Sequence, residues 1–193
     1  LGSHTNVHTD PQPLPLTPNQ YGEQPLPGLR NFAEISATMS QLTGVPEGYS
    51  EVPDTYQRLR AQLPSEENIE AFLTAHQVGV AQLAIEYCNA LVEAERNNDA
   101  SIQPLFVGMN YSAGADTLSQ QNWKDWVISP LFERMVGNGQ ASQPDRNGVE
   151  SELEDLLFNT NLTQCSSDCV ERTATATKAA CAAMLGSATM LFQ

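Results

Sequence analysis

The feature that most constrains the fold is a long helical period in the middle of the chain, at about residues 66–96. Largely apolar side chains recur there every three or four positions, the spacing that places them on one face of an α-helix: Ile69, Leu73, His76, Val80, Leu83, Tyr87 and Leu91. A second set, Val78, Ile85 and Val92, lies on a different side of the same helix. A helix that is apolar on more than one side needs neighbours on more than one side. We therefore expect it to be the central helix of a bundle.

Shorter stretches with the same spacing flank this helix. We expect further helices at about 32–42, 56–63, 119–136, 149–157 and 167–185. Pro130 falls inside one of them and either kinks the helix or starts a new one. No stretch shows sustained alternation of apolar and polar residues. The sequence therefore predicts an all-α fold, an irregular bundle of about six helices around a long central helix.

The first 28 residues differ in composition from the rest. They contain six prolines, which forbid a regular helix and favour an extended, polyproline-like backbone. We expect residues 1–28 to be an extended proline-rich N-terminal arm or linker, to which a cloning tag can contribute, and residues 29–193 to be the helical domain. The chain starts without Met, and Ala188–Gln193 still has the apolar pattern of packed structure. We therefore expect a piece cut from a longer polypeptide.

The charge is strongly acidic. Nine Lys and Arg residues face 23 Asp and Glu residues, which gives a formal net charge of −14. Nucleic acid needs a cationic binding surface, and an anionic membrane would repel this chain. No apolar run approaches the roughly 18 residues of a transmembrane helix. We therefore expect no nucleic acid and no transmembrane segment, and a partner that is another protein or another domain of the same polypeptide.

The four cysteines are an even number, as is typical of an oxidising compartment. Cys165 and Cys169 stand at the start of the last predicted helix, where a local disulfide is the best interpretation. Cys88 and Cys181 each lie within a helix beside an apolar stripe, so they can bridge the bundle if those helices pack. The alternative is four free or buried thiols. The disulfides favour a periplasmic, cell-surface or extracellular location.

Few residues have the arrangement of a metal or catalytic site. His76 is either a structural histidine of the core or a functional one, that is, a metal ligand or a catalytic base. No partner of the Glu-x-x-His type lies on its helix. His4 and His8, with Asp10 nearby, are weak metal candidates, because their spacing binds a metal well only on a helix. The Cys-x3-Cys spacing of Cys165 and Cys169 disfavours a zinc knuckle. We expect no cofactor and no catalytic group.

Two further groups of residues have both a structural and a functional interpretation. Trp123 and Trp126 are three apart on one helix, where they can contact a sugar or a partner, or belong to the core. Acidic residues gather on the helix near Leu153, where they are expected to form a solvated face or, as the alternative, to bind calcium loosely: Glu150, Glu152, Glu154 and Asp155.

Three segments, Leu29–Val45, Leu63–Cys88 and Ala179–Ser187, are similar to stretches of large exported proteins of marine gammaproteobacteria. Those proteins often carry laminin-G-like, concanavalin-type domains as well. The resemblance covers about residues 29–193. It implies a secreted or envelope setting and a helical, non-catalytic module, for which no functional residues carry over.

These observations favour a non-catalytic structural or protein-interaction module of an exported, multidomain envelope protein. The alternative is a domain of a secreted protein that binds a sugar or calcium or is associated with electron transfer. An enzyme would require His76 to stand in an open pocket beside an acidic residue of altered pKa.

Overall fold

The computed structural model describes residues 30–63, 74–136 and 144–187, and these residues are all-α. The proline-rich arm and the predicted helical residues 66–73 lie outside the described residues. The helices are α1 (Phe32–Thr43), α2 (Val52–Arg60), α3 (Thr74–Arg96), α4 (Gln120–Trp123), α5 (Ser129–Met135), α6 (Arg146–Glu154) and α7 (Cys169–Leu185). A 3-10 turn spans Ala115–Thr117, and π-helical turns span Lys124–Ile128 and Asp155–Asn159.

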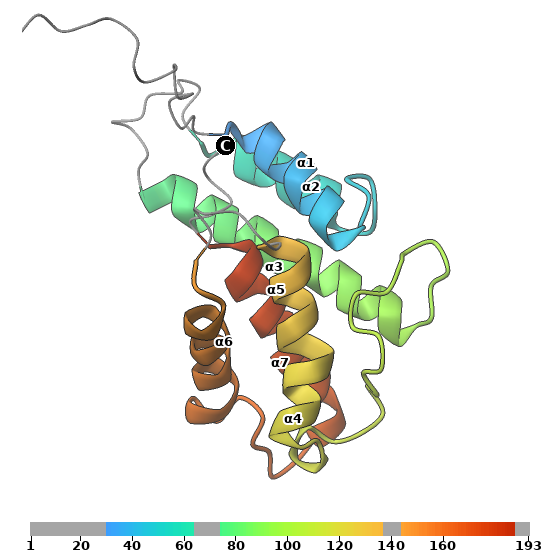
Figure 1. Ribbon diagram of the computed structural model, residues 1–193. Helices are drawn as coiled ribbons and strands as arrows, with labels where there is room; N and C mark the ends of the chain where they lie inside the picture. Colours follow the sequence, from blue (N-terminus) through green and yellow to red (C-terminus); the bar gives the residue numbers. More distant parts are fainter. Residues whose placement is uncertain (1–29, 64–73, 137–143, 188–193) are drawn as a thin grey trace, which may run out of the picture.

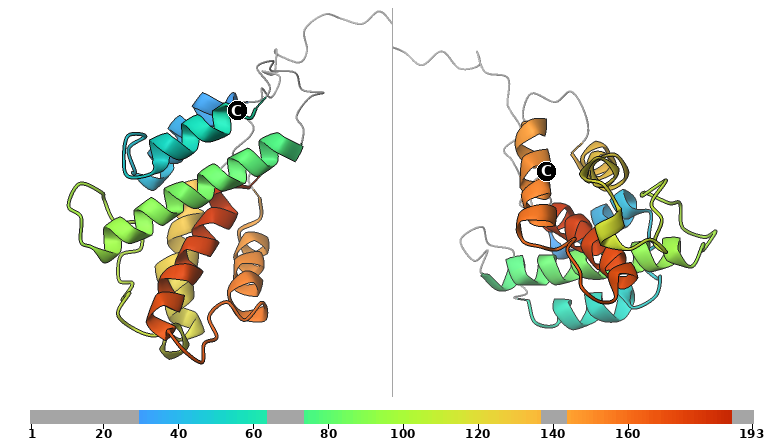
Figure 2. Two further views of the ribbon diagram at one scale, coloured as in Figure 1. Left: turned by 180° about the vertical axis from the view of Figure 1, so that it is seen from behind. Right: turned by 90° about the horizontal axis from the view of Figure 1, so that it is seen from below.

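The helices are arranged around α3, as the sequence predicts. Helices α1 and α2 lie on one side of α3, and α4, α5, α6 and α7 lie on the other (Figures 1 and 2). The most extensive helix pair in the described residues is α3 with α7. None of the described helices combines the length and apolar composition that a bilayer span requires. The predicted all-α bundle around a central helix is confirmed.

Pro130 neither ends nor restarts the helix in which it lies. Helix α4, the π-helical turn and α5 form one continuous run, with Pro130 in the first turn of α5. The Ser129 N–H donates to the carbonyl of Lys124, five residues back. Such a widened turn is a common way for a helix to accommodate a local defect in its hydrogen bonding. Proline lacks the N–H that would continue the regular pattern, and the π turn lies directly before it.

Side-chain caps mark where three of the described helices begin, and at α4 Ser119 and Asn122 form a capping box. Asn31 and Glu34 form a reciprocal capping box at the start of α1, and the side chain of Asp145 accepts from the Gly148 N–H at the start of α6. Helix α1 ends at Gly44, which has φ of 73°, a left-handed conformation that glycine adopts without steric cost. These local signals fix the ends of α1 to within a residue of the sequence prediction.

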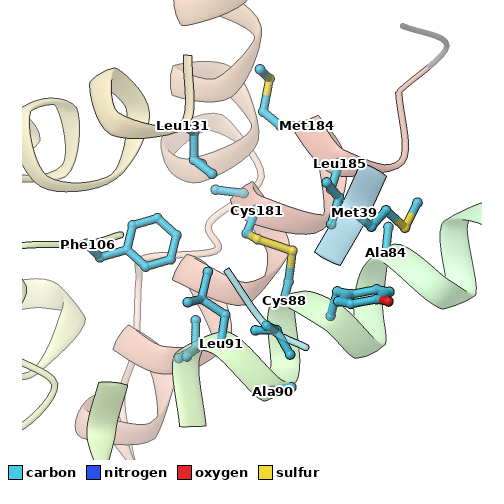
Figure 3. Packing of buried hydrophobic residues seen from close by; sticks show 14 of the residues in the cluster. Met39, Ala84, Cys88, Ala90, Leu91, Phe106, Leu131, Cys181, Met184 and Leu185 are labelled. Carbon is cyan, nitrogen blue, oxygen red and sulfur yellow. A yellow bond between two sulfur atoms is a disulfide. The ribbon is translucent and has the colours of Figure 1, made fainter. Parts of the chain in front are cut away.

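Helices α3 and α7 approach closely because their facing side chains are small. Ala84 and Cys88 of α3 are fully buried, as are Ala180 and Cys181 of α7. A Cβ built on Gly186, directly after α7, would lie 3.6 Å from the Ala84 Cβ. Larger residues such as Leu91, Phe106, Leu131 and Leu185 surround this contact and complete the core (Figure 3). The core thus combines a close helix pair with a ring of bulky side chains.

The second apolar stripe of α3 is only partly buried. Val92 is fully buried, whereas Val78 is 48% exposed and Ile85 is 57% exposed. The expectation that this whole stripe faces a neighbouring helix is wrong for Val78 and Ile85. Packing of α1, α2 and α7 leaves one side of α3 open at these two positions.

Candidate functional site

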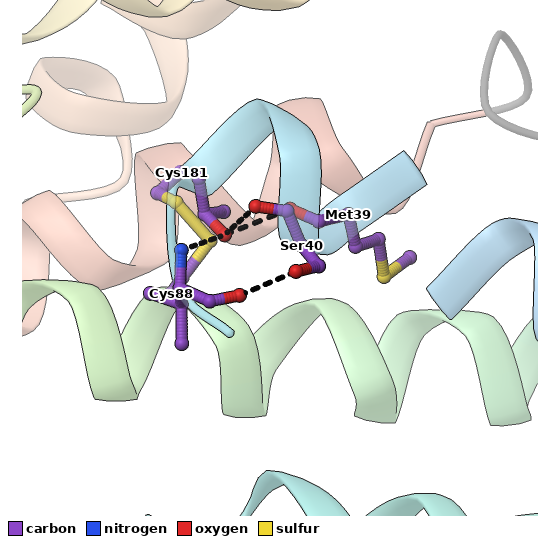
Figure 4. Close-up of a disulfide and its surroundings, with 6 residues drawn as sticks. Met39, Ser40, Cys88 and Cys181 are labelled. Carbon is purple, nitrogen blue, oxygen red and sulfur yellow. Dashed lines mark hydrogen bonds between the residues drawn. A yellow bond between two sulfur atoms is a disulfide. The ribbon is translucent and has the colours of Figure 1, made fainter. Parts of the chain in front are cut away.

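The structure joins the two helices of the core pair through a disulfide. Cys88 of α3 is bonded to Cys181 of α7, with 5.8 Å between the Cα atoms and a sequence separation of 93. Both residues are fully buried. Met39 and Ser40 of α1 lie beside the bond (Figure 4). The Ser40 hydroxyl donates to the Val45 carbonyl at 2.7 Å, so the end of α1 is closed by its own hydrogen bonds next to the sulfurs.

The second disulfide lies at the other end of α7. Cys169, the first residue of α7, is bonded to Cys165, with a Cα–Cα distance of 5.4 Å. Both cysteines are partly exposed. The N-cap residue Asp168 has a left-handed backbone and makes no side-chain cap hydrogen bond. The two cysteine pairs therefore fit the pairing predicted from the sequence, and the described residues contain no free cysteine.

Glu95 holds the loop that follows α3. One of its oxygens accepts from the backbone N–H groups of Leu105 and Phe106, at 2.6 and 3.1 Å. The other accepts from the Tyr111 hydroxyl at 2.9 Å. Burial raises the pKa of Glu95, and the three hydrogen bonds oppose that rise. Burial and the nearby Glu95 carboxylate raise the pKa of Tyr111. This carboxylate is committed to shaping the loop.

Two cations join the C-terminal part of α3 to α7. Arg96 of α3 contacts Glu171 of α7 at 2.6 Å, and Lys178 of α7 contacts Glu93 of α3 at 2.5 Å. The hydrogen bond from Lys178 is the main cause of the lowered pKa of Glu93. These groups are partly exposed, so each pair contributes little by itself to stability. Together they align the polar edges of the core pair.

The acidic residues of α6 do not all form a solvated face. Glu150 is only 7% exposed and contacts Arg146 at 2.6 Å and Lys124 at 3.4 Å. Burial acts to raise the pKa of Glu150, but the hydrogen bonds and charges of these two cations outweigh it and lower the pKa. Glu150 precedes Leu153 by three positions and Leu157 by seven, which places it on the buried side of the helix. The prediction of a solvated face is therefore wrong for Glu150.

An apolar groove lies between α6 and the C-terminal end of α7. It has a volume of about 510 Å³. Its apolar wall consists of six side chains from α7, from α6 and the turn that follows it, and from the end of α5: Val136, Val149, Leu153, Leu156, Ala183 and Met184. Asp145 and Glu152, both exposed, supply negative charge at its edge. We call this surface the α6–α7 groove. It combines apolar contact area with an acidic rim.

The two tryptophans have different environments. Trp123 is fully buried and belongs to the core, so it offers no surface to a sugar or a partner. Trp126 is partly buried, and its ring lies 3.1 Å from the position that a Cβ would take on Gly108. Trp126 therefore packs against the backbone of the loop at Gly108, which has φ of 102°.

His76 is partly buried near the start of α3. His4, His8 and Asp10 lie outside the described residues. In the described part of the chain, only Asp116, Cys165 and Cys169 bring three groups of metal-ligating type together. Sequence reasoning assigned no role to Asp116.

Sequence reasoning also missed Glu95 and the α6–α7 groove. The signal for Glu95 was available, because it stands four positions after Leu91 and so continues the apolar stripe of α3. A carboxylate on a buried face has to receive hydrogen bonds. The groove has no comparable signal, because it depends on how α5, α6 and α7 pack.

Comparison with known proteins adds no relative: no family model, no curated protein and no solved structure matches this chain.

Proposed function

We propose that the helical domain is a non-catalytic protein-interaction module of an exported, multidomain protein, and that it binds its partner in the α6–α7 groove. The groove is the observation that carries this proposal. It offers an apolar wall on the outside of the bundle, where a partner can bury side chains that water would otherwise surround.

The disulfides support the exported setting. Both cysteine pairs are bonded, and one of them is partly exposed, where a reducing cytosol would attack it. The two disulfides are compatible with a non-cytoplasmic protein. A module that is cross-linked in this way keeps its fold in an oxidising compartment, where the bonds are not reduced.

The shifted carboxylates support a structural rather than a catalytic role. Glu95 receives three hydrogen bonds from the loop, and Glu150 receives contacts from Arg146 and Lys124. Each is already engaged by groups of the chain itself. A general base needs a free lone pair that points at a substrate.

The charge of the groove defines the chemistry of the partner. Asp145 and Glu152 stand at its edge, and the chain as a whole carries −14. A fitting partner is an amphipathic helix with apolar anchors on one face and Lys or Arg beside them. Its apolar side chains would pack on the apolar wall, and its cations would lie beside the acidic rim. The same helix with acidic flanks would be repelled.

A synthetic helical peptide with leucines on one face and lysines on the other provides the probe. We expect it to bind the 193-residue chain, as measured by fluorescence anisotropy, and a leucine–glutamate peptide of equal length to bind at least tenfold more weakly. Ala183→Phe fills the groove from an exposed position and should weaken binding of the lysine peptide at least tenfold. Ala37→Phe, at an exposed position of α1, is the matched control and should leave binding unchanged.

Equal binding by the Ala183→Phe and Ala37→Phe variants would show that the groove is not the binding face. A chain shortened to end at Ser187 tests an internal occupant. If it binds the peptide more tightly than the full chain, residues 188–193 compete for the groove, and the proposed external partner loses its support.

A further inference from the structure

We propose that Asp116, Cys165 and Cys169 form a redox-gated metal site, which binds a thiophilic divalent cation such as Zn²⁺ when the Cys165–Cys169 disulfide is reduced. The site lies at the N-terminal end of α7, away from the α6–α7 groove, and shares no residue with it.

The first support is the grouping of the ligand atoms. One carboxylate oxygen of Asp116 and the two cysteine sulfurs all lie within 4.8 Å of one another. Neighbouring ligand atoms of a tetrahedral zinc–thiolate site are about 3.8 Å apart. Thiolate and carboxylate are both zinc ligands, and two thiolates favour zinc over magnesium or calcium. The arrangement leaves the fourth position to water, since Asp116 is exposed and the cysteines are partly exposed.

Gly114 provides independent support. Its backbone, with φ of −68° and ψ of 142°, is a conformation that any residue adopts, so the turn itself does not require glycine. A Cβ at this position, however, would lie 2.7 Å from the Asp116 carboxylate oxygen and 3.0 Å from the Cβ of Cys169. A side chain at position 114 would therefore displace the Asp116 carboxylate and crowd Cys169.

The loop that carries Asp116 is fixed to α7. The Thr173 hydroxyl donates to the Ala113 carbonyl at 2.7 Å, and the Thr117 hydroxyl donates to the Gly114 carbonyl at 2.7 Å. The carboxylate is therefore held beside Cys169 by contacts that do not involve the disulfide. These contacts do not depend on the sulfur–sulfur bond, so Asp116 and Cys169 stay adjacent when the sulfurs separate, and Cys165 remains four residues from Cys169 in the chain.

The gate is an exchange of the sulfur–sulfur bond for two sulfur–metal bonds. A dithiol reductant transfers two electrons and two protons to the disulfide, is itself oxidised to a disulfide, and leaves two free thiols. Binding of Zn²⁺ then releases the two thiol protons and forms two sulfur–zinc bonds. A disulfide oxidant reverses the change: it accepts two electrons from the thiolates and becomes a dithiol, the Cys165–Cys169 bond forms again, and the ion is released. The buried Cys88–Cys181 bond is shielded from the reductant, so the rest of the bundle stays cross-linked.

The test uses the full chain, treated with a phosphine reductant that does not itself chelate zinc. We expect thiol titration to yield two thiols with the helical circular dichroism unchanged. The reduced chain should bind one Zn²⁺ in calorimetry. With Co²⁺ as the probe it should show thiolate-to-cobalt absorption. The oxidised chain should bind at least a hundredfold more weakly.

Three variants assign the ligands. The Cys165→Ser and Cys169→Ser double variant should lose binding. Asp116→Asn should weaken it at least tenfold, and Gly114→Ala should weaken it by displacing Asp116. Asp125→Asn, at an exposed acidic position elsewhere, is the matched control and should bind like the parent chain.

Equal zinc binding by the oxidised chain or the double serine variant would assign the ion to other groups, such as His4 and His8 or surface carboxylates, and overturn the proposal. Absence of thiolate-to-cobalt absorption would also overturn it. Equal affinity of the Asp116→Asn and Asp125→Asn variants would remove the carboxylate from the site.

Discussion

Helix α7 carries one cysteine of each disulfide, and the two bonds have opposite surroundings. Cys181 lies in the buried contact with α3, and its bond closes a sequence separation of 93. Cys169 is the first residue of the helix, is partly exposed, and its bond closes a separation of 4. The same covalent chemistry therefore cross-links the core at one end of α7 and leaves an accessible, reducible group at the other.

The difference follows from the residues that surround each pair. At the inner bond, small side chains such as Ala84 and Ala180 let α3 and α7 approach, and the larger residues around them exclude water. At the outer bond, the neighbours are the turn at Gly114 and the exposed Asp116. We infer that the inner bond contributes to stability and that the outer bond is free to take part in chemistry.

The largest expected effect comes from removing the inner bond. In the double variant Cys88→Ala with Cys181→Ala, we expect the free energy of unfolding to fall by about 4 kcal/mol, because the unfolded chain regains the entropy of a long loop. Urea denaturation followed by circular dichroism measures the loss. A loss below about 1 kcal/mol would mean that packing of α3 on α7, rather than the bond, maintains the core pair.

The next effect tests the close approach of α3 and α7. Ala84 is fully buried against the end of α7, so Ala84→Leu should push the helices apart and cost about 2 kcal/mol. Ala37→Leu, on the exposed side of α1, should change stability by less than about 0.5 kcal/mol. If both variants melt at the same temperature, the small residues of the core pair are not what sets its spacing.

Removing the outer bond should cost less than removing the inner one. For Cys165→Ala with Cys169→Ala, the short loop gives an expected loss of about 2 kcal/mol, and the helical content should be unchanged. The measurement is the same urea titration. If the free energy of unfolding falls as much as it does when the inner bond is removed, the two disulfides do not differ in their contribution to stability.

The inner end of α7 was the easier part to predict from the sequence. The period of α3 identified the central helix, and the position of Cys88 and Cys181 beside apolar stripes predicted their pairing. Local signals of this kind depend on residues three or four apart on one helix. Within the described part of α3 they were misleading for Val78 and Ile85, which are exposed.

The outer end was harder to predict because it depends on contacts between distant segments. Asp116 meets Cys169 through a turn that the sequence does not distinguish from other loops, and Thr173 reaches Ala113 across 60 positions. Glu150 and Glu95 show a related difficulty. The charge of Glu150 indicated solvent exposure, whereas its place in the helical period puts it on a buried face; Glu95 is partly buried and continues the apolar stripe of α3.

The smallest expected effect concerns Glu95, which shapes the loop between α3 and the outer end. Its pKa in the folded chain is raised above the usual 4.5, chiefly by burial, so the folded state holds the proton more tightly than the unfolded state. The stability that this group contributes is therefore present below about pH 4.5 and is lost as the pH rises through the folded pKa. Glu95→Gln cannot titrate, so the parent chain should lose stability relative to this variant between about pH 4 and pH 7.

Urea denaturation of both chains at the two pH values measures this difference. Glu152→Gln, at an exposed position of α6, is the control and should retain the pH dependence of the parent chain. If Glu95→Gln retains it too, the ionisation of Glu95 is not coupled to folding. If the variant instead loses its helical structure at both pH values, the loop requires the full carboxylate, because glutamine keeps one acceptor oxygen for Leu105 and Phe106 but has no second acceptor for the Tyr111 hydroxyl. The comparison of Glu95→Gln with the parent chain therefore shows whether the loop that follows α3 is held by a carboxyl group whose protonation changes with pH.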